Sequence, residues 1–169
     1  VLTAMEKVDR GKYIRGTFED RAYEDTPLPI ACGQTISQPF IVALMTDLLN
    51  VAPGDKVLEV GTGSGYQAAV LAAIVREVFS IEIIESLGRE AARALAAAGY
   101  RNVQTRIGDG YAGWPDEAPF DGIIVTAAAP YVPQPLIDQL KNGGRLVIPL
   151  GEAQGAQSLF VINKDAHGT

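Results

Sequence analysis

Cysteine and histidine are nearly absent from this sequence of 169 residues, which has one of each. Cys32 has no partner for an internal disulfide, so the fold must depend on its hydrophobic core, as cytosolic proteins generally do. His167 alone cannot complete a zinc ligand set, and neither a Ser-His-Asp nor a Cys-His site is expected. We therefore expect a cytoplasmic protein without a metal, and we disfavour metal-dependent hydrolysis and acyl transfer.

Long apolar runs and positive charge are also scarce. No stretch approaches the roughly 20 consecutive apolar residues that a transmembrane helix needs. Lys and Arg number 14 against 20 Asp and Glu, which gives a net charge of −6. Proteins that bind nucleic acid instead concentrate Lys and Arg to neutralise phosphates. We expect neither a membrane nor a nucleic-acid partner, and we take a monomer as the working expectation.

The length and the absence of repeats predict a single domain that spans residues 1–169. Residues 12–36 form an irregular segment rich in turn formers, among them Asp25-Thr26-Pro27 and Pro29. We predict that this segment is a long loop or arm. Long loops in compact domains are often functional, so the arm is a candidate part of an active site.

A glycine-rich segment carries the clearest functional signal. Residues 56–60 form a short apolar run that includes Glu59, which predicts a buried parallel strand. Gly61, Gly63 and Gly65 follow at alternate positions, with Thr62 between the first two, and a helix is predicted from there. Glycine lets the backbone bend sharply and lets a ligand approach it without meeting a Cβ atom. The pattern is typical of a loop that binds a nucleotide cofactor.

Strands and helices alternate along the rest of the chain. Further strands are predicted at residues 78–82, 103–107, 120–125, 145–149 and 158–162, and helices at 1–9, 37–49, 65–74, 85–98 and 135–141. This alternation predicts an α/β fold with a doubly wound, mostly parallel sheet. Ligands of such sheets bind at the carboxyl ends of the strands, where the strand order reverses.

Some side chains can be assigned to packing or to the surface. Phe40, Leu44 and Leu48 recur at helical spacing, which supports the helix predicted to end near Leu49. Cys32 and Trp114 are expected to be packing residues. His167, in a polar tail, is expected to be exposed.

Two cofactors compete for the glycine loop. In a nicotinamide fingerprint the third glycine lies three residues after the second, whereas here the glycines are evenly spaced after Glu59, which favours S-adenosylmethionine. Glu82, 23 residues after Glu59, could grip the two hydroxyls of a ribose, but NAD enzymes also place an acid there. No tyrosine is followed four residues later by lysine, which weighs against a dehydrogenase. Asp109, next to Gly110, could accept the adenine amino group.

Each of these features also has a simpler interpretation. Glycines after a strand can be only a tight turn, and Glu82 can be a solvated strand end. The Asp109-Gly110 pair is a common turn dipeptide, and Ser37 before Gln38-Pro39 can serve only as a helix cap. Their joint placement at the ends of three predicted strands is what favours a cofactor site.

The sequence resembles the protein-L-isoaspartate O-methyltransferase family over nearly its whole length. The most specific segments are residues 23–30 (YEDTPLPI) and 33–39 (GQTISQP), which a generic methyltransferase does not need. Residues 61–69, 108–110 and 119–121 are similarly typical of the family. Ala31-Cys32 differs from the glycine-containing pair often found there, which makes the local geometry of the arm less certain. The family usually has further sequence at both ends, so we expect this chain to be truncated there.

The resemblance implies a Rossmann-like methyltransferase fold that uses S-adenosylmethionine. It also implies methyl transfer to the free carboxylate of L-isoaspartyl, and less efficiently D-aspartyl, residues in damaged proteins, which starts repair through a succinimide. Carried over by position, Ser37 is the active-site hydroxyl, and Thr35 and Ile36 line the pocket. Residues 61–65 would cradle the methionine part of the cofactor, while Glu82, Asp109 and Gly110 would hold its ribose and adenine.

The implied chemistry agrees with the missing histidine. An α-carboxyl group has a pKa of roughly 3.3 to 3.7, so at neutral pH it is already the nucleophile and needs no base. The protein has only to bring a carboxylate oxygen within about 3 to 3.5 Å of the methyl carbon and to remove its water. Ser37 would hold the carboxylate rather than attack.

Two alternatives remain at this point. The chain could be a methyltransferase of the same fold that acts on another substrate, although the arm argues against this. It could also be a noncatalytic module that uses the cofactor fold to recognise protein partners. The intact Ser37, Glu82 and glycine loop argue against the second alternative.

Overall fold

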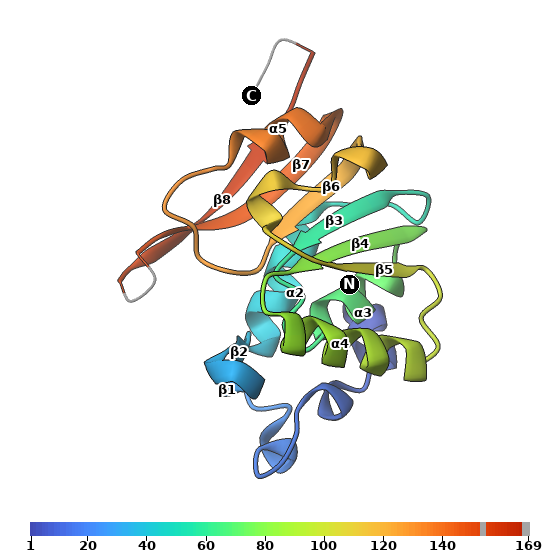
Figure 1. Ribbon diagram of the computed structural model, residues 1–169, viewed down its shortest axis with the longest axis vertical. Coiled ribbons are helices and arrows are strands. Elements are labelled where there is room, and N and C mark those ends of the chain that lie inside the picture. The colour runs from blue at the N-terminus through green and yellow to red at the C-terminus, as the bar shows by residue number, and fades with distance from the viewer. Residues whose placement is uncertain (153–154, 167–169) are drawn as a thin grey trace.

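The computed structural model describes residues 1–152 and 155–166, so His167 lies outside the described residues. Its centre is a six-stranded sheet with the order β5-β4-β3-β6-β7-β8, which runs diagonally through the molecule in Figure 1. The strands are β3 (Lys56–Val60), β4 (Glu77–Glu82), β5 (Val103–Ile107), β6 (Phe120–Val125), β7 (Leu140–Gly151) and β8 (Gln157–Asn163). All the strands predicted from the sequence are therefore confirmed, and β7 is longer than expected.

The sheet is mostly parallel, as predicted. β3 pairs in parallel with β4 on one side and with β6 on the other, whereas β8 runs antiparallel to β7. The chain proceeds outward from β3 to β5 and then returns to the other side of β3 as β6. The strand order thus reverses between β3 and β6, and their carboxyl ends are the expected place for a ligand.

Helices cover the sheet on both faces. They are α1 (Leu2–Lys7), α2 (Pro39–Leu49), α3 (Tyr66–Ala72), α4 (Glu85–Ala97) and α5 (Gln134–Gln139). Buried residues of α1, α2, α3 and α4 pack with Val57 on one face, while α5 packs with Leu58 on the other. Adjacent strand residues point to opposite faces, so each strand of the centre contributes to both cores. The fold is the doubly wound, Rossmann-like arrangement predicted from the sequence.

The three apolar residues whose spacing predicted α2 do not form its buried face. Phe40 is 57% exposed and Leu44 and Leu48 are only half-buried, whereas Val42 and Met45 are buried. Nearly every residue of this helix is apolar, so the spacing fits more than one stripe. The packing against the sheet, and not the periodicity, determines which stripe is buried.

The arm, residues 12–36, gathers at the lower end of the molecule in Figure 1. The short turn η1 (Arg10–Tyr13) leads into it, and it contains the turns η2 (Glu19–Arg21) and η3 (Ala31–Gly33) and a small hairpin of β1 (Leu28–Pro29) and β2 (Thr35–Ile36). The hairpin gives local structure to a segment that was expected to be only a loop.

Of the two residues expected to pack, one does so. Trp114 packs edge-on against Phe79, with ring centres 5.3 Å apart. Cys32 is exposed, so that expectation is wrong. Its φ of 59° places it in the left-handed region, in the turn between β1 and β2, and its Sγ lies 3.3 Å from Ser86 Oγ at the surface.

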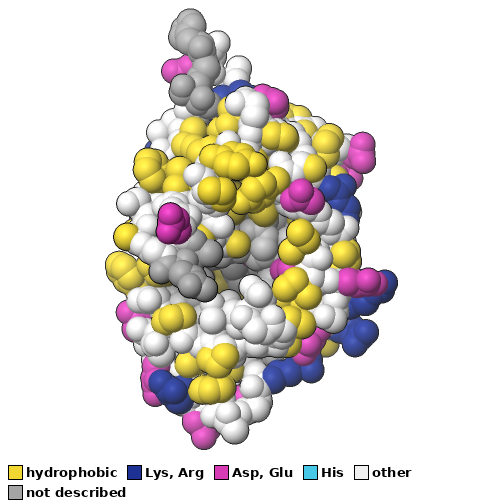
Figure 2. All heavy atoms as spheres, turned by 60° about the vertical axis from the view of Figure 1, so that its left-hand side comes forward, with side chains coloured by type: hydrophobic (Ala, Val, Ile, Leu, Met, Phe, Trp, Pro, Cys, Tyr) yellow, Lys and Arg dark blue, Asp and Glu magenta, His cyan; other side chains and the backbone are white. Residues whose placement is uncertain are grey.

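The surface shows where apolar and charged side chains gather. In Figure 2, hydrophobic side chains cover much of the upper half of the visible face, and Lys and Arg side chains lie mainly near its lower and right-hand margins. Within residues 1–152 and 155–166, no helix has the length and apolar character needed to cross a membrane.

Candidate active site

The glycine loop lies between β3 and α3, at the carboxyl end of the central strand. The amide of Gly61 donates to the carbonyl of Ile81 at 2.8 Å, which ties the start of the loop to β4. Gly61 has a φ of 99°, and a Cβ atom there would lie 2.6 Å from Thr126 Oγ1. A side chain at this position would therefore clash with the end of β6, and only glycine fits.

Glu59 lies beneath the loop and is fully buried. Ser80 Oγ donates to Glu59 Oε2 at 2.5 Å, and Thr62 Oγ1 lies 2.6 Å from Ser80 Oγ. Glu59 Oε1 has no hydrogen-bond partner within the described part of the chain. Burial raises the pKa of Glu59 to about 8, the hydrogen bond from Ser80 opposes this shift, and the charge of Glu82 adds to it.

Glu59 is not placed to contact a ligand directly. It lines none of the cavities described below, and its carboxyl group reaches the loop only through Ser80 and Thr62. Its predicted part in cofactor binding would therefore be indirect, through the position of Thr62.

Glu82 ends β4 beside the glycine loop. Its Oε2 accepts the amide of Gly63 at 2.9 Å, and its Oε1 accepts the amide of Ile84 at 3.0 Å. The two hydrogen bonds fix the carboxylate at the mouth of the site. An ionised carboxylate has about four lone-pair sites, so Glu82 can still accept hydrogen bonds from the hydroxyls of a ribose.

Asp109 and Gly110 follow β5. Asp109 Oδ1 accepts the amide of Tyr111 at 2.9 Å, which shapes the turn. Gly110 is buried against Val60, and a Cβ atom added there would overlap Val60 Cγ1. A side chain at this position would therefore have to push the end of β3 and the turn after β5 apart.

A cavity of about 280 Å³ joins these strand ends. Among the predicted residues, it is lined by Thr35, Gly61, Gly63, Glu82, Asp109 and Gly110. The structure thus brings the ends of β3, β4 and β5 together with the arm, as the sequence predicted. The volume is close to the lower end of the range usual for small-molecule sites, which begins at about 300 Å³.

Several lining residues were not predicted from the sequence. Ile83 is 69% exposed and lies at the mouth of this cavity with Tyr111, while Gln34 and Thr126 complete its wall. Ile83 directly follows Glu82, but its exposure is known only from the structure, and nothing in the sequence distinguishes it from a core residue. The flat ring of Tyr111 and the apolar side chain of Ile83 suit a planar base such as adenine.

A smaller cavity of about 50 Å³ adjoins the first, since both are lined by Thr35, Gly61, Gly63 and Thr126. Ile36 and Ser37 of the arm line it on one side. Thr62, Ser64, Tyr66 and Gln67 of the loop and α3 line it on the other. The predicted substrate residues and the predicted cofactor loop therefore face one another across this cavity.

Ser37 is not the cap of α2. Gln38 occupies that position without a side-chain cap, and Asp25 Oδ1 of the arm accepts the amide of Phe40 at 2.9 Å. Asp25 thus satisfies a free amide at the start of the helix. The simpler interpretation of Ser37 as a helix cap is not supported, and its side chain remains available to the cavity.

A third and larger cavity, of about 440 Å³, lies on the other side of the hairpin, between the arm and α4. Of the predicted site residues it touches only Gly63. The three cavities contain no metal-binding cluster, since the described residues include no group of three or more His, Cys, Asp or Glu side chains suited to an ion.

The geometry fits S-adenosylmethionine. Gly61 and Gly110 both line the larger cavity, and close packing against Thr126 and Val60 leaves no room for a side chain at either position. Glu82 and Asp109 supply acceptors at the ends of adjacent strands. Comparison with known proteins agrees with this assignment.

The model of one protein family, described as protein-L-isoaspartate(D-aspartate) O-methyltransferase, matches residues 1–169. A protein-L-isoaspartate O-methyltransferase of Polaromonas sp. is 58% identical over all of this chain and 80% of its own length. One of Nitrosospira multiformis is 59% identical over all of this chain and 72% of its own length.

Solved structures give the same result. A protein-L-isoaspartate O-methyltransferase superposes with a TM-score of 0.89 and 31% identity over 97% of this chain, which spans 55% of that protein. A Plasmodium falciparum protein of the same family, solved in complex with S-adenosyl-L-homocysteine, gives a TM-score of 0.84 and 31% identity. That match covers 99% of this chain and 83% of the solved one. With its fold, its site and its sequence in agreement, the chain belongs to the protein-L-isoaspartate(D-aspartate) O-methyltransferase family.

Proposed function

We propose that this chain transfers a methyl group from S-adenosylmethionine to the free carboxylate of L-isoaspartyl residues, and of D-aspartyl residues, in damaged proteins. The observation that carries the proposal is the small cavity, where Thr35, Ile36 and Ser37 face the glycine loop. The names of relatives 58% and 59% identical to the chain give the same substrate. The segment specific to the family thus meets the segment common to methyltransferases at one place.

The larger of the two adjoining cavities is the proposed cofactor site. Glu82 would accept the ribose hydroxyls, Asp109 would accept the adenine amino group, and Gly110 would leave room for the ring. Gly61 to Gly65 would hold the methionine part. When bound, S-adenosylmethionine supplies an activated methyl group to the adjacent small cavity.

Ser37 is the proposed catalytic residue, with the role of holding the substrate. The isoaspartyl carboxylate is ionised at neutral pH, because an α-carboxyl pKa is roughly 3.3 to 3.7, and so it needs no general base. The hydroxyl of Ser37 can donate one hydrogen bond to a carboxylate oxygen and leave the other oxygen free to react. Thr35 would contact the substrate at the border of the two cavities.

Removal of water is the second task of the site. Ile36 is buried behind Ser37, and Val42 and Met45 of α2 add further apolar surface to the small cavity. A carboxylate that enters this space loses part of its hydration, which makes it a better nucleophile.

The methyl ester is the first step of repair. Methanol leaves an ester far more readily than oxide leaves an ionised carboxylate. The adjacent backbone nitrogen can therefore attack the ester carbonyl, release methanol and close a succinimide, whose hydrolysis returns some normal aspartate. The partners would be polypeptides with isoaspartyl residues, which we propose the chain meets in the cytoplasm, as a monomer that acts as one methyltransferase domain.

The experiment that tests the proposal compares two peptides that differ only in isoaspartate or aspartate at one position. Each is incubated with the chain and S-adenosylmethionine labelled at the methyl group. Label that is lost in base and appears only on the isoaspartyl peptide would support repair. Label on neither peptide, with cofactor bound, would instead support a noncatalytic module, and base-stable label would indicate another substrate class.

A further inference from the structure

Arg10 is a buried charged residue that the site described above does not use. Its side chain is among the largest in the chain that are fully buried, and it lies at the start of η1. Burial of a charged group is costly unless hydrogen bonds compensate it. The partners of Arg10 therefore indicate what its burial maintains.

Three segments that are distant in the sequence meet at this guanidinium. Arg10 Nε donates to the carbonyl of Ala22 in the arm at 2.6 Å, and Nη2 donates to the carbonyl of Ser37 at 2.8 Å. The Arg10 Cζ atom lies 4.9 Å from the ring centre of Tyr66, the first residue of α3. One side chain thus connects the arm, the proposed catalytic residue and the helix that follows the glycine loop.

These contacts depend on the shape of the guanidinium as well as on its charge. Within residues 1–152 and 155–166, Arg10 forms no ion pair and its Nη1 has no hydrogen-bond partner. The guanidinium is held there by two carbonyl oxygens and an aromatic face. A planar fork can donate in two directions and still stack on a ring, whereas the ammonium of lysine is a compact point charge. Lysine could not make the three contacts together.

The location of two of these contacts points to catalysis. Ser37 and Tyr66 lie on opposite sides of the small cavity, where the carboxylate and the methyl group would meet. Arg10 touches neither Glu82 nor Asp109 in the cofactor cavity. We propose that Arg10 is a positioning residue for methyl transfer, which fixes the backbone of Ser37 relative to α3; this role rests on the proposed function.

The test separates turnover from cofactor binding in Arg10→Lys. A small displacement of a catalytic group can cost about 100-fold in rate, so we expect kcat with an isoaspartyl peptide to fall about 10- to 100-fold. The Kd for S-adenosyl-L-homocysteine, measured by calorimetry, should stay within about twofold, because the cofactor cavity is untouched. This split distinguishes a positioning role from a general loss of structure.

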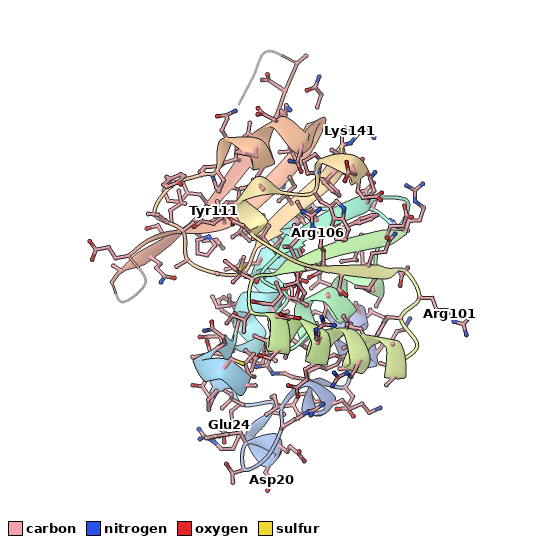
Figure 3. The ribbon with its side chains drawn as sticks, in the orientation of Figure 1. Asp20, Glu24, Arg101, Arg106, Tyr111 and Lys141 are labelled. Carbon is pink, nitrogen blue, oxygen red and sulfur yellow. The ribbon has the colours of Figure 1, made fainter. Side chains whose placement is uncertain are left out.

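Arg101→Lys is the matched control. Arg101 is exposed just before β5, and Figure 3 shows it at the opposite side of the molecule from Tyr111, which lines the cofactor cavity. The same substitution there should change neither kcat nor Kd.

A second variant, Arg10→Ala, tests the role of the guanidinium itself. Added guanidinium ion, at a concentration that does not denature the wild-type chain, can enter the space that truncation leaves and donate to the same carbonyls. We expect it to restore part of kcat, about 10-fold, while potassium chloride at equal ionic strength restores none.

Several results would overturn the proposal. A folded Arg10→Lys variant with wild-type kcat would do so. A variant whose affinity for S-adenosyl-L-homocysteine falls by the same factor as its kcat would also do so. Unfolding of both variants at room temperature, or absence of guanidinium rescue, would make Arg10 a residue of fold stability alone. A wild-type chain that binds cofactor but does not methylate the peptide would refute the proposed function, and the positioning role with it.

Discussion

Ser37 is the residue on which the proposed chemistry depends most. It lines the small cavity, it does not cap α2, and its carbonyl is held by Arg10. We expect Ser37→Ala to fold and to bind S-adenosyl-L-homocysteine as the wild-type chain does, but to lose most methyl transfer to an isoaspartyl peptide. Thermal unfolding and calorimetry check the first two expectations, and label transfer checks the third. Wild-type turnover in the variant would remove Ser37 from the mechanism.

Glu59 makes stability depend on pH. Its pKa is raised from an ordinary value of 4.5 to about 8, chiefly by burial, so between these values the folded chain holds a proton that the unfolded chain releases. The folded state binds more protons in this window, and the free energy of unfolding therefore falls as the pH rises through it. The slope can reach about 1.4 kcal/mol per pH unit for one group.

Glu59→Gln removes this titration but can keep the hydrogen bond from Ser80. We expect the variant to gain stability relative to the wild-type chain as the pH rises from about 4.5 to about 8. Urea denaturation of both chains across that range measures the difference. A difference that does not change with pH would show that Glu59 stays ionised when folded.

Gly110 tests the proposed adenine site. A Cβ atom at this position would overlap Val60, so Gly110→Ala must shift either the turn or the strand end that forms the cavity. Overpacking of this kind typically costs 1–3 kcal/mol, and we expect the affinity for S-adenosyl-L-homocysteine to fall about 10-fold or more. Gly54→Ala is the control, since a Cβ atom at Gly54 meets nothing within 4 Å. Equal affinities in both variants would contradict the assignment of the cavity.

At the scale of elements, the arm and the glycine loop form the site together. β2 carries Thr35 and Ile36 to the cavities, and Ile30 lies close to Gly63, where a Cβ atom would be 3.8 Å from Ile30 Cδ1. The arm therefore lies across the loop. A ligand in the cavities would contact both segments at once.

Hydrogen exchange with and without S-adenosyl-L-homocysteine tests this arrangement. We expect the ligand to slow exchange of amides in residues 61–65 and 34–37 together, because both segments line the cofactor cavity. Exchange in β8, which lines none of the three cavities discussed, should stay unchanged. Protection of the glycine loop without the arm would show that the arm does not close on the cofactor.

The sequence predicted the elements well where local pattern and packing agree. The strand with Glu59 and the glycines after it were predicted because apolar runs and close-approach glycines are local features. The spacing of Phe40, Leu44 and Leu48 predicted α2 but not which of its faces is buried, because an apolar helix has no polar face to mark its exposed side. The exposed Cys32 and the capping role of Asp25 were missed, since both depend on the path of the arm.

For the whole molecule, the order of the strands explains how separate motifs form one site. Glu82 and Asp109 lie at the ends of β4 and β5, beside the loop that follows β3. The sheet therefore brings these residues together although they are far apart in the sequence. The predicted cofactor residues could be found in this way. Ile83 and Tyr111 could not, because no chemical pattern distinguishes an apolar lining residue from a core residue.

The substrate lies beyond what the cofactor site can specify. Many methyltransferases share this fold, and we propose that the choice of an isoaspartyl carboxylate depends on the arm and on Ser37, which follows it. The central prediction is therefore selectivity between two peptides of identical composition, which differ only in which carboxyl group of one residue is free.

The most direct measurement is the rate of methyl ester formation on an isoaspartyl peptide, divided by the rate on its aspartyl counterpart, at saturating S-adenosylmethionine. We predict base-labile methylation of the isoaspartyl peptide at its free α-carboxylate and none above background on the aspartyl peptide. Equal rates on the two peptides, or no transfer to either by a chain that binds the cofactor, would contradict the proposed function.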